Sequence, residues 1–166
     1  GQVNEVIFED VRVPAAMMVG EKDKGWQNLR ESLAMERVGL GGIRNVPRLF
    51  QELVNYCKET LRDGKPLIEC EYVRHTLAEM KIRIRIAQLM YFQAAWLQSQ
   101  GEDIEVKASF SKQFSSELYQ FFSTRAMEIL GIHGQAQRGD KYAVLRGDIE
   151  LWYRHCIATT IGGGTT

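Results

Sequence analysis

An alternation of three- and four-residue steps constrains the fold of this chain more than any other feature. The positions that follow it are Trp26, Leu29, Leu33, Glu36, Leu40, Ile43, Pro47, Phe50, Val54 and Cys57. This spacing places all ten side chains on one face of a helix. We therefore predict a long helix from about residue 24 to about residue 61. A kink is expected at Pro47, because proline removes a helical hydrogen bond.

Glu36 is the one carboxylate on this otherwise apolar face. An ionised carboxylate that faces a core is costly, so it raises its pKa or finds a positive partner. Such a group suits proton abstraction at neutral pH. A buried glutamate neutralised by Arg37, Arg44 or an arginine of another helix fits the pattern equally well. The periodicity alone leaves both interpretations open.

Three further helices are predicted, at about residues 69–99, 104–130 and 142–158, the last interrupted or bent at Gly147. Short turns between long helices make neighbours antiparallel. The predicted fold is therefore all-α, an up-and-down four-helix bundle. Residues 4–13 alternate apolar and polar side chains and predict a short extended segment, as from a sheet that is absent here. The expected apolar faces of the second and third helices are Val73, Leu77, Met80, Ile84, Ala87, Tyr91 and Ala94, and Phe110, Phe114, Leu118, Phe121 and Ile129.

Two groups of glycines have candidate functional roles. Gly39, Gly41 and Gly42 follow Glu36, and each weakens a helix by about 1 kcal/mol relative to alanine. They indicate the close approach of either another helix or a ligand. Residues 162–166 read Gly-Gly-Gly-Thr-Thr. Their backbone N–H groups suit a phosphate or a flavin edge, although such a run is also typical of a flexible tail.

The composition argues against several classes of function. Lysine plus arginine and aspartate plus glutamate each number 21, so no net charge attracts nucleic acid or an anionic membrane. The three cysteines show no CxxC spacing, which argues against a disulfide framework and a zinc site and favours a reducing, cytoplasmic compartment. The three histidines lack the Glu-x-x-His spacing of a di-iron bundle. No apolar run is long enough for a membrane span.

Several short sequence motifs, in the same order along the chain, resemble those of the acyl-CoA dehydrogenase family. They are residues 5–14, 19–21 and 24–26, Glu36-Arg37, and residues 64–67, 77–80, 94–96 and 159–165. The resemblance covers essentially the whole chain. It implies that residues 1–22 are the tail of a preceding β-domain with its linker, and that residues 23–166 are the family's C-terminal four-helix bundle domain. The remaining FAD and acyl-CoA contacts would lie on absent domains, so the fragment alone is expected to be inactive.

The resemblance also implies a reaction, the α,β-dehydrogenation of an acyl-CoA thioester. In the family a glutamate removes the α-proton and hydride passes from the β-carbon to FAD. An electron-transfer acceptor then takes the electrons from the reduced FAD. Most members carry that glutamate in a terminal phrase like YEGT, and here its position is Gly163. Members resembling the isovaleryl and long-chain types carry it on the first helix, in a phrase like ERL, and here its position is Glu36. The resemblance therefore implies Glu36 as the catalytic base, with Arg37 and Gly41 as substrate-binding residues.

The cofactor implied by the resemblance is FAD, held partly between subunits. Its expected contacts in this chain are Arg62, Glu71, Gly131, Gly134, Gly163, Gly164 and Thr165. The family's arginine that contacts the FAD pyrophosphate is replaced by Thr60, and Arg62 would have to substitute for it two positions later. The implied assembly is a homodimer or homotetramer formed through the bundle. The alternative is a non-catalytic or half-site subunit of a heteromeric acyl-CoA dehydrogenase.

Overall fold

The structure is a computed structural model, and it describes residues 4–41, 43 and 45–164. The chain divides into two compact units, Gly1–Ser32 and Leu33–Thr166. In the first unit a 3₁₀ turn, Ala15–Met17, follows residues 4–13, whose side chains are all exposed. Residues 4–13 form no strand. The predicted extended segment therefore has no ladder partner among the described residues.

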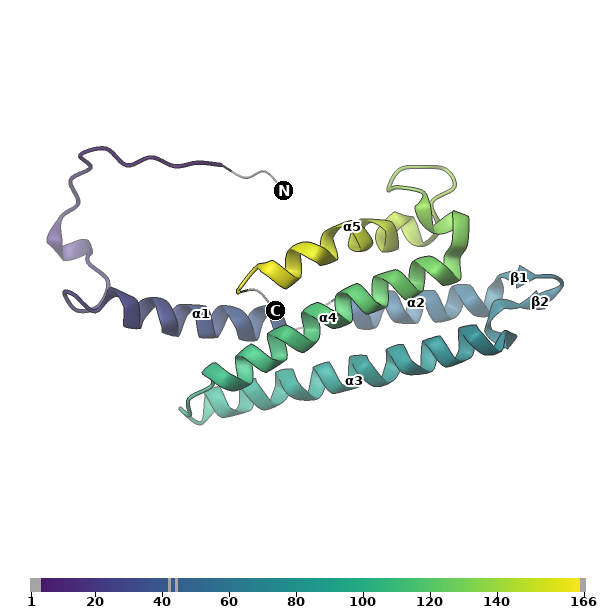
Figure 1. Cartoon of the computed structure of the whole chain (residues 1–166), viewed down its shortest axis with the longest axis horizontal. Helices are drawn as coiled ribbons and strands as arrows, with labels where there is room; N and C mark the ends of the chain where they lie inside the picture. The colour runs from purple at the N-terminus through teal and green to yellow at the C-terminus, as the bar shows by residue number, and fades with distance from the viewer. Residues whose placement is uncertain (1–3, 42, 44, 165–166) are drawn as a thin grey trace. The chain divides into compact units, whose positions relative to one another are not determined.

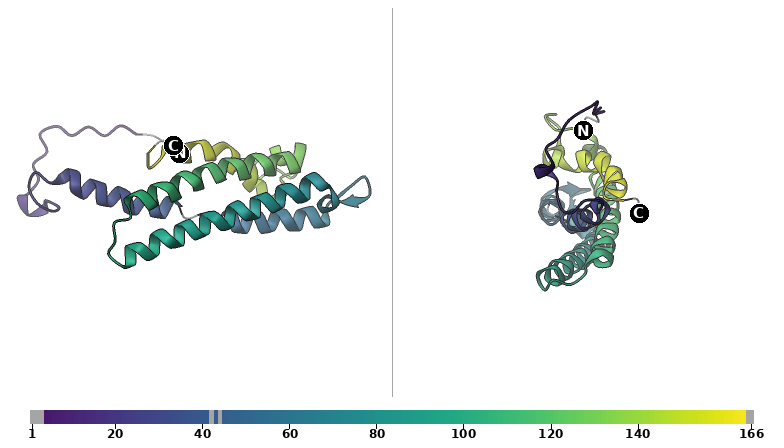
Figure 2. Two further views of the ribbon diagram at one scale, coloured as in Figure 1. Left: turned by 60° about the horizontal axis from the view of Figure 1, so that its bottom comes forward. Right: turned by 90° about the vertical axis from the view of Figure 1, so that its left-hand side faces the viewer.

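The second unit is helical, and α4 lies between α3 and α5 (Figures 1 and 2). The all-α fold class is confirmed, and the second and third predicted helices agree with the structure to within two residues. The α-helices are α1 (Gly25–Gly41), which begins in the first unit, α2 (Val46–Glu59), α3 (Glu71–Ser99), α4 (Glu105–Leu130) and α5 (Asp148–Ile161). Between them lie the strands β1 (Leu61–Arg62) and β2 (Lys65–Pro66) and the 3₁₀ turns Leu67–Glu69, Gly131–Gln135 and Val144–Gly147.

The single long first helix predicted from the sequence is wrong, because the chain forms two helices there. Helix α1 ends at Gly41, and α2 begins at Val46 with Pro47 in its first turn. Proline is tolerated at that place, where its missing N–H has no helical partner to lose. Gly39 and Gly41 weaken the end of α1 for the reason given above. The expected kink at Pro47 is therefore a break just before it.

The break also changes which side chains reach the core. Phe50 and Cys57 are buried as predicted, but Trp26 is 71% exposed and Glu36 is exposed. Of the side chains described on α1, Ala34 and Val38 are buried, and they pack in a small cluster with Ala94, Ile104 and Ala108. A stripe drawn through two separate helices cannot face one core, so the interpretation of Glu36 as a core residue is wrong.

The face predicted for α4 is confirmed in part, since Leu118 and Ile129 are buried and Phe114 and Phe121 are half-buried against the core. Phe110 is 56% exposed, whereas Ser111, Lys112, Ser115 and Ser116 are buried. A helix packed between two neighbours needs small side chains where the backbones approach closely, so the large aromatic residue lies outside the contact. The face predicted for α3 is largely confirmed, since Val73, Leu77, Met80, Ile84, Ala87 and Ala94 are buried and Tyr91 is half-buried.

The connection between α2 and α3 is a tight hairpin. Asp63 and Gly64 have φ of 53° and 78°, as a type I′ turn requires at both central residues. Strands β1 and β2 pair around it, with Leu61 opposite Pro66. This hairpin lies at the end of the bundle where α2 ends and α3 begins (Figure 1).

A buried carboxylate ties the start of α5 to the rest of the bundle. The Asp148 side chain is 5% exposed and accepts hydrogen bonds from Arg138 at 2.6 and 2.9 Å, from Arg146 at 3.1 Å and from Arg48 at 3.3 Å. Burial alone would raise its pKa, but the bonds from the three arginines hold the pKa of Asp148 below its usual value. The fourth predicted helix begins later than expected, because the chain is interrupted at Gly147 and α5 starts at Asp148. The φ of Gly147 is 70°, and an added Cβ would lie 2.6 Å from the backbone nitrogen of Arg138.

We predict that Asp148→Asn lowers the free energy of unfolding by about 1–3 kcal/mol at neutral pH, since charge-assisted hydrogen bonds are lost. The folded-state pKa lies below the unfolded value, so this stabilisation is present above about pH 4 and is lost as the pH falls through the folded pKa. Urea unfolding at pH 7 and near pH 3 measures both. Glu102→Gln, at an exposed site, is the control. An equal difference at the two pH values would contradict the assignment.

Candidate functional site

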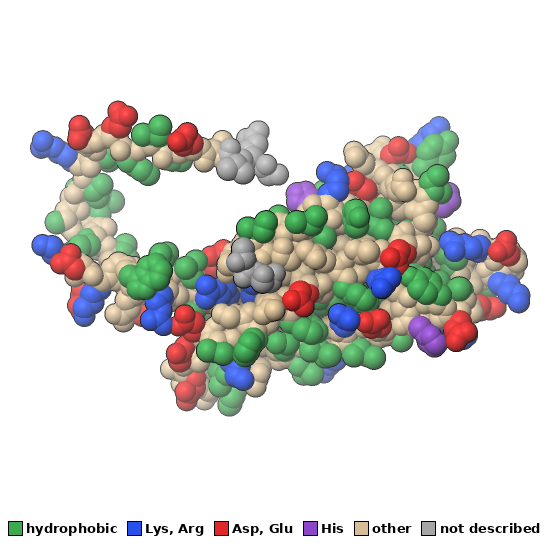
Figure 3. Space-filling model, in the orientation of Figure 1, with side chains coloured by type: hydrophobic (Ala, Val, Ile, Leu, Met, Phe, Trp, Pro, Cys, Tyr) green, Lys and Arg blue, Asp and Glu red, His purple; other side chains and the backbone are tan. Residues whose placement is uncertain are grey.

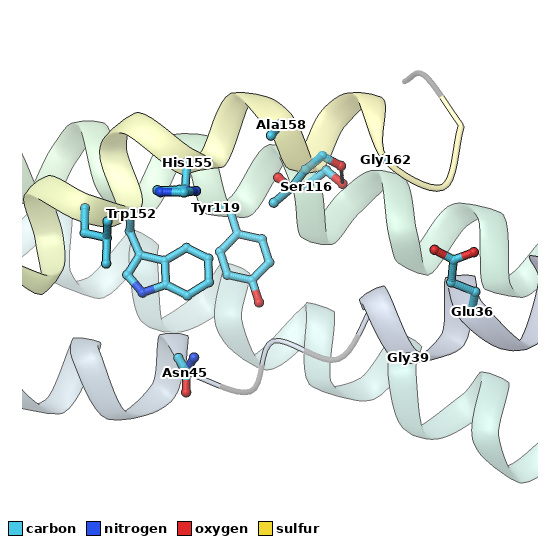
Figure 4. Close-up of a pocket in the computed structure, with 11 residues that line it drawn as sticks. Glu36, Gly39, Asn45, Ser116, Tyr119, Trp152, His155, Ala158 and Gly162 are labelled. Atoms are coloured by element: carbon cyan, nitrogen blue, oxygen red, sulfur yellow. Dashed lines mark hydrogen bonds between the residues drawn. The ribbon is translucent and has the colours of Figure 1, made fainter. Parts of the chain in front are cut away.

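A cavity of about 750 Å³ lies among the end of α1, the start of α2, and the facing sides of α4 and α5. All of its lining residues belong to the second unit (Figure 4). They are Glu36, Gly39, Asn45, Ser116, Tyr119, Leu151, Trp152, His155, Ala158, Thr159 and Gly162. A concave site of this size, with few polar groups, is typical of small-molecule binding.

One side of the cavity is aromatic. Tyr119 of α4 and Trp152 of α5 stack with ring centroids 5.1 Å apart and an interplanar angle of 6°. His155, one turn along α5 from Trp152, and Asn45, just before α2, add polar groups on the same side (Figure 4). This side suits an apolar or flat group with a polar substituent.

Glu36 lies on the other side of the cavity (Figure 4). The ion pairs of the described residues do not include Glu36, and Arg44 lies outside those residues, so pairing with it is not described. Gly39, one turn further along α1, also lines the cavity, and an added Cβ there would meet no atom within 4 Å. No helix crossing among the described residues therefore explains Gly39. Gly41 is the last residue of α1, and Gly42 lies outside the described residues.

Arg37 connects α1 to the segment that follows α5. Its Nε donates a hydrogen bond to the Gly163 carbonyl oxygen at 3.1 Å. Gly163 and Gly164 have φ of 73° and 105°, the left-handed region that favours glycine. Gly162, at the start of this segment, lines the cavity together with Glu36. The structure thus brings together the helix of Glu36 and the glycines predicted as cofactor contacts. Thr165 lies outside the described residues.

Lys112 is a residue of this region that the sequence analysis missed. It is 4% exposed, and its Nζ donates to the carbonyl oxygens of Thr160, at 3.3 Å, and Gly164. Burial, and secondarily the nearby Arg37, hold its pKa below the usual lysine value. The sequence pattern could have revealed Lys112, because it shares a face of α4 with Ala108, Ser115 and Tyr119, where a lysine is unexpected.

The other predicted cofactor residues gather near the hairpin. Arg62 donates to the Ile129 carbonyl at 3.4 Å, close to Gly131, which ends α4 with φ of 59°. Gly134 is buried, and an added Cβ would lie 3.0 Å from the Leu130 Cβ, so a larger residue would have to displace that neighbour by a few tenths of an ångström. Glu71 is exposed and begins α3.

The predicted cofactor residues therefore form two groups. Arg62, Gly131 and Gly134 lie near the start of α5, whereas Gly163 and Gly164 follow its end (Figure 1). Helix α5 has 14 residues, so it is about 21 Å long. One phosphate group cannot contact both groups within one chain.

Neither a metal-binding cluster nor a membrane-spanning helix occurs in the described part of the chain. It contains no cluster of three or more His, Cys, Asp or Glu side chains placed to hold a metal ion. None of its helices is both long enough and apolar enough to cross a bilayer. Its three cysteines are free, and burial raises the pKa of Cys57 to about 11.

We predict that Ser116→Ala destabilises the contact between α4 and the end of α5. The buried Ser116 hydroxyl lies 2.9 Å from the Thr159 carbonyl and 2.8 Å from the Lys112 carbonyl. Its loss should lower the free energy of unfolding by about 1 kcal/mol. Ser109→Ala is the matched control, because the Ser109 hydroxyl bonds only within α4, to Glu105. Urea unfolding compares them, and an equal loss in both variants would contradict the prediction.

The chain is similar in sequence and in structure to the members of one protein family. Residues 23–166 match the family described as acyl-CoA dehydrogenase, C-terminal domain. The chain is 32% identical to acyl-CoA dehydrogenase FadE26 of Mycobacterium tuberculosis over 162 residues, which are 95% of this chain and 40% of that protein.

Two solved structures are also similar. The structure of butyryl-CoA dehydrogenase from Megasphaera elsdenii aligns with a TM-score of 0.86 at 27% identity, over 96% of this chain and 40% of that one. The structure of the ChsE4–ChsE5 complex from Mycobacterium tuberculosis aligns with a TM-score of 0.84 at 32% identity, over 95% and 40%. The chain thus spans about 40% of the length of these relatives.

Proposed function

Since the chain belongs to the acyl-CoA dehydrogenase family and matches its C-terminal domain, we propose that it is part of an enzyme that oxidises an acyl-CoA thioester between its α- and β-carbons. Glu36 is the proposed base. The observation that carries this role is the position of Glu36 at the margin of the cavity, with the adjacent Arg37 bonded to Gly163. The two positions at which the family carries its base, here Glu36 and Gly163, are thus on directly connected segments.

The proposed chemistry needs one carboxylate and room beside it. The Glu36 carboxylate takes the α-proton, and the electron pair of that C–H bond forms the new Cα=Cβ bond. Bound FAD would supply the acceptor for the hydrogen and two electrons that leave the β-carbon, and an electron-transfer partner would then receive those electrons. Gly163 has no side chain to compete with Glu36, and Gly39 leaves open space one turn away. Arg37 and Gly41 are the proposed substrate-binding residues near this base.

The residues around the cavity fit a flavin. The segment 162–164 offers side-chain-free backbone, with Gly163 and Gly164 at positive φ, at the edge of an aromatic cavity. Backbone of this kind lets a flat ring approach closely and supplies N–H donors. Gly163, Gly164 and Thr165 are therefore the proposed contacts on this side. Arg62, Glu71, Gly131 and Gly134 are the proposed contacts for FAD at the hairpin end.

The distance of about 21 Å along α5 supports sharing of FAD between subunits, with each bundle contributing one group to each of two FAD molecules. A surface for such assembly is available on α3, where Ile82, Ile86, Leu89 and Trp96 are exposed along one helical face. Figure 3 shows hydrophobic side chains along this part of the bundle. We propose a homodimer or homotetramer through this bundle. The free cysteines support a reducing, cytoplasmic location.

Glu36→Gln tests the proposed base in the full-length protein. We expect FAD to remain bound, because the substitution keeps the shape of the side chain, and the anaerobic bleaching of the flavin by acyl-CoA to slow by on the order of 10²–10⁴-fold. Glu31→Gln, on an exposed part of α1, should bleach like the wild type. Unchanged bleaching in Glu36→Gln would move the base elsewhere.

Moving the carboxylate provides a complementary test. We expect the double variant Glu36→Gly, Gly163→Glu to recover part of the bleaching lost in Glu36→Gly, because both positions would serve one α-carbon. Recovery should be incomplete, since a non-glycine residue at positive φ costs roughly 1–2 kcal/mol. The control is Glu36→Gly with Gly163→Gln. No recovery in a double variant that still holds FAD would contradict a shared site.

A second candidate is a half-site or non-catalytic subunit of a heteromeric acyl-CoA dehydrogenase. It is favoured by Thr60, which follows α2 at the position where the family has its pyrophosphate-binding arginine, and by Arg62, which already donates to the Ile129 carbonyl. Similarity to one structure of a two-component complex also supports it. The discriminating observation is whether the full-length protein, purified without a partner, retains yellow FAD.

A further inference from the structure

We propose that Lys112 is a positioning residue that holds residues 160–164 at the edge of the cavity, and thereby sets the geometry around Glu36. The inference rests on the proposed function, because it concerns the same site. Lys112 is on α4 and acts through the backbone of the segment that follows α5. It bonds that backbone at Thr160 and Gly164.

The first argument is the cost of this lysine. A buried ammonium loses the solvation of bulk water, and the structure gives Lys112 neutral carbonyl partners in return. The lowered pKa of Lys112 reflects its burial and the repulsion of Arg37. An apolar side chain of similar length would occupy the same place without these penalties. Burial alone therefore disfavours a lysine at this position, so its presence depends on what the ammonium group contacts.

The second argument is what the lysine contacts. The last carbonyl groups of a helix have no partners within it and carry partial negative charge, so a cation there is favourable. Helix α5 ends at Ile161, and Lys112 reaches the Thr160 carbonyl in its last turn and the Gly164 carbonyl beyond it. Ser116, one turn along α4, reaches the Thr159 carbonyl. Helix α4 thus supplies hydrogen-bond donors to the carbonyl groups at the end of α5.

The third argument is the composition of the held segment. Gly162, Gly163 and Gly164 have no side chains with which to anchor themselves, and glycine is the most flexible residue in backbone conformation. Their position must therefore be fixed from outside, and among the described residues Arg37 and Lys112 are the cations that bond to this segment, at Gly163 and Gly164. Gly162 lines the cavity with Glu36. A displacement of about 1 Å near reacting atoms costs on the order of 10²-fold in rate.

The test compares Lys112→Met, Lys112→Arg and the control Lys107→Met in the full-length FAD-containing protein. Lys107 is exposed on the same helix. We expect Lys112→Met to bind acyl-CoA within about twofold of wild type but to show a limiting rate of anaerobic flavin reduction lower by about tenfold or more. Lys112→Arg, which keeps the charge, should fall between them, and Lys107→Met should match wild type.

Hydrogen exchange of the peptide that contains residues 160–164 provides a readout independent of turnover. Lys112→Met should speed exchange there by at least about tenfold, with the middle of α4 unchanged. Unchanged exchange in this peptide overturns the inference, whether or not the protein is a dehydrogenase. If Lys112→Met does not fold, Lys112→Gln, which removes the charge but stays polar, replaces it, and wild-type exchange and reduction in that variant overturn the inference.

The two proposals fail separately. Wild-type protein that is never bleached by acyl-CoA would contradict the proposed function. Faster hydrogen exchange of residues 160–164 in Lys112→Met would still support the positioning of this segment by Lys112. Wild-type protein that is bleached, with Lys112→Met reduced as fast as Lys107→Met, overturns the role of Lys112 and leaves the proposed function intact.

Discussion

The hydrogen bond from Arg37 to the Gly163 carbonyl is the contact on which the account of this chain depends. It joins the end of α1 to the end of the described chain, two segments that are 126 residues apart in sequence. Because Glu36 precedes Arg37, the same contact sets where its carboxylate lies relative to the glycines after α5. The buried Lys112 adds a second hold on those glycines from α4.

The placement of the candidate site also follows from the break between α1 and α2. A continuous helix would have carried Glu36 into the core along with Phe50 and Cys57. The break after Gly41 instead leaves Glu36 exposed on the cavity and allows Asn45 to line the opposite side. Tyr119 and Trp152, stacked between α4 and α5, then form an apolar wall. The chain therefore presents one carboxylate at the edge of an aromatic site, and this arrangement supports the proposed role of Glu36 as a base.

Much of this architecture was predictable from the sequence. The periodicity of α3, the Asp63-Gly64 turn and the interruption at Gly147 are local patterns, and local chemistry decides them. The periodicity through residues 26–57 misled because spacing does not show where a helix stops, and Pro47 fits both a kink and a first turn. The role of Lys112 was not predictable, because it depends on carbonyl groups 48 and 52 residues away. The coincidence of Glu36 with one of the family's two base positions came from resemblance, whereas its exposure to the cavity came from the structure.

The measurement that tests the central claim most directly is loss of α-deuterium from an acyl-CoA whose β-carbon is replaced by sulfur, so that proton abstraction is observed without oxidation. The full-length protein with FAD and its Glu36→Gln variant would be compared at matched occupancy. The account predicts that the wild type releases the deuterium to solvent and that Glu36→Gln binds the thioester without releasing it. Release at the wild-type rate by Glu36→Gln would show that another group is the base and would contradict the account.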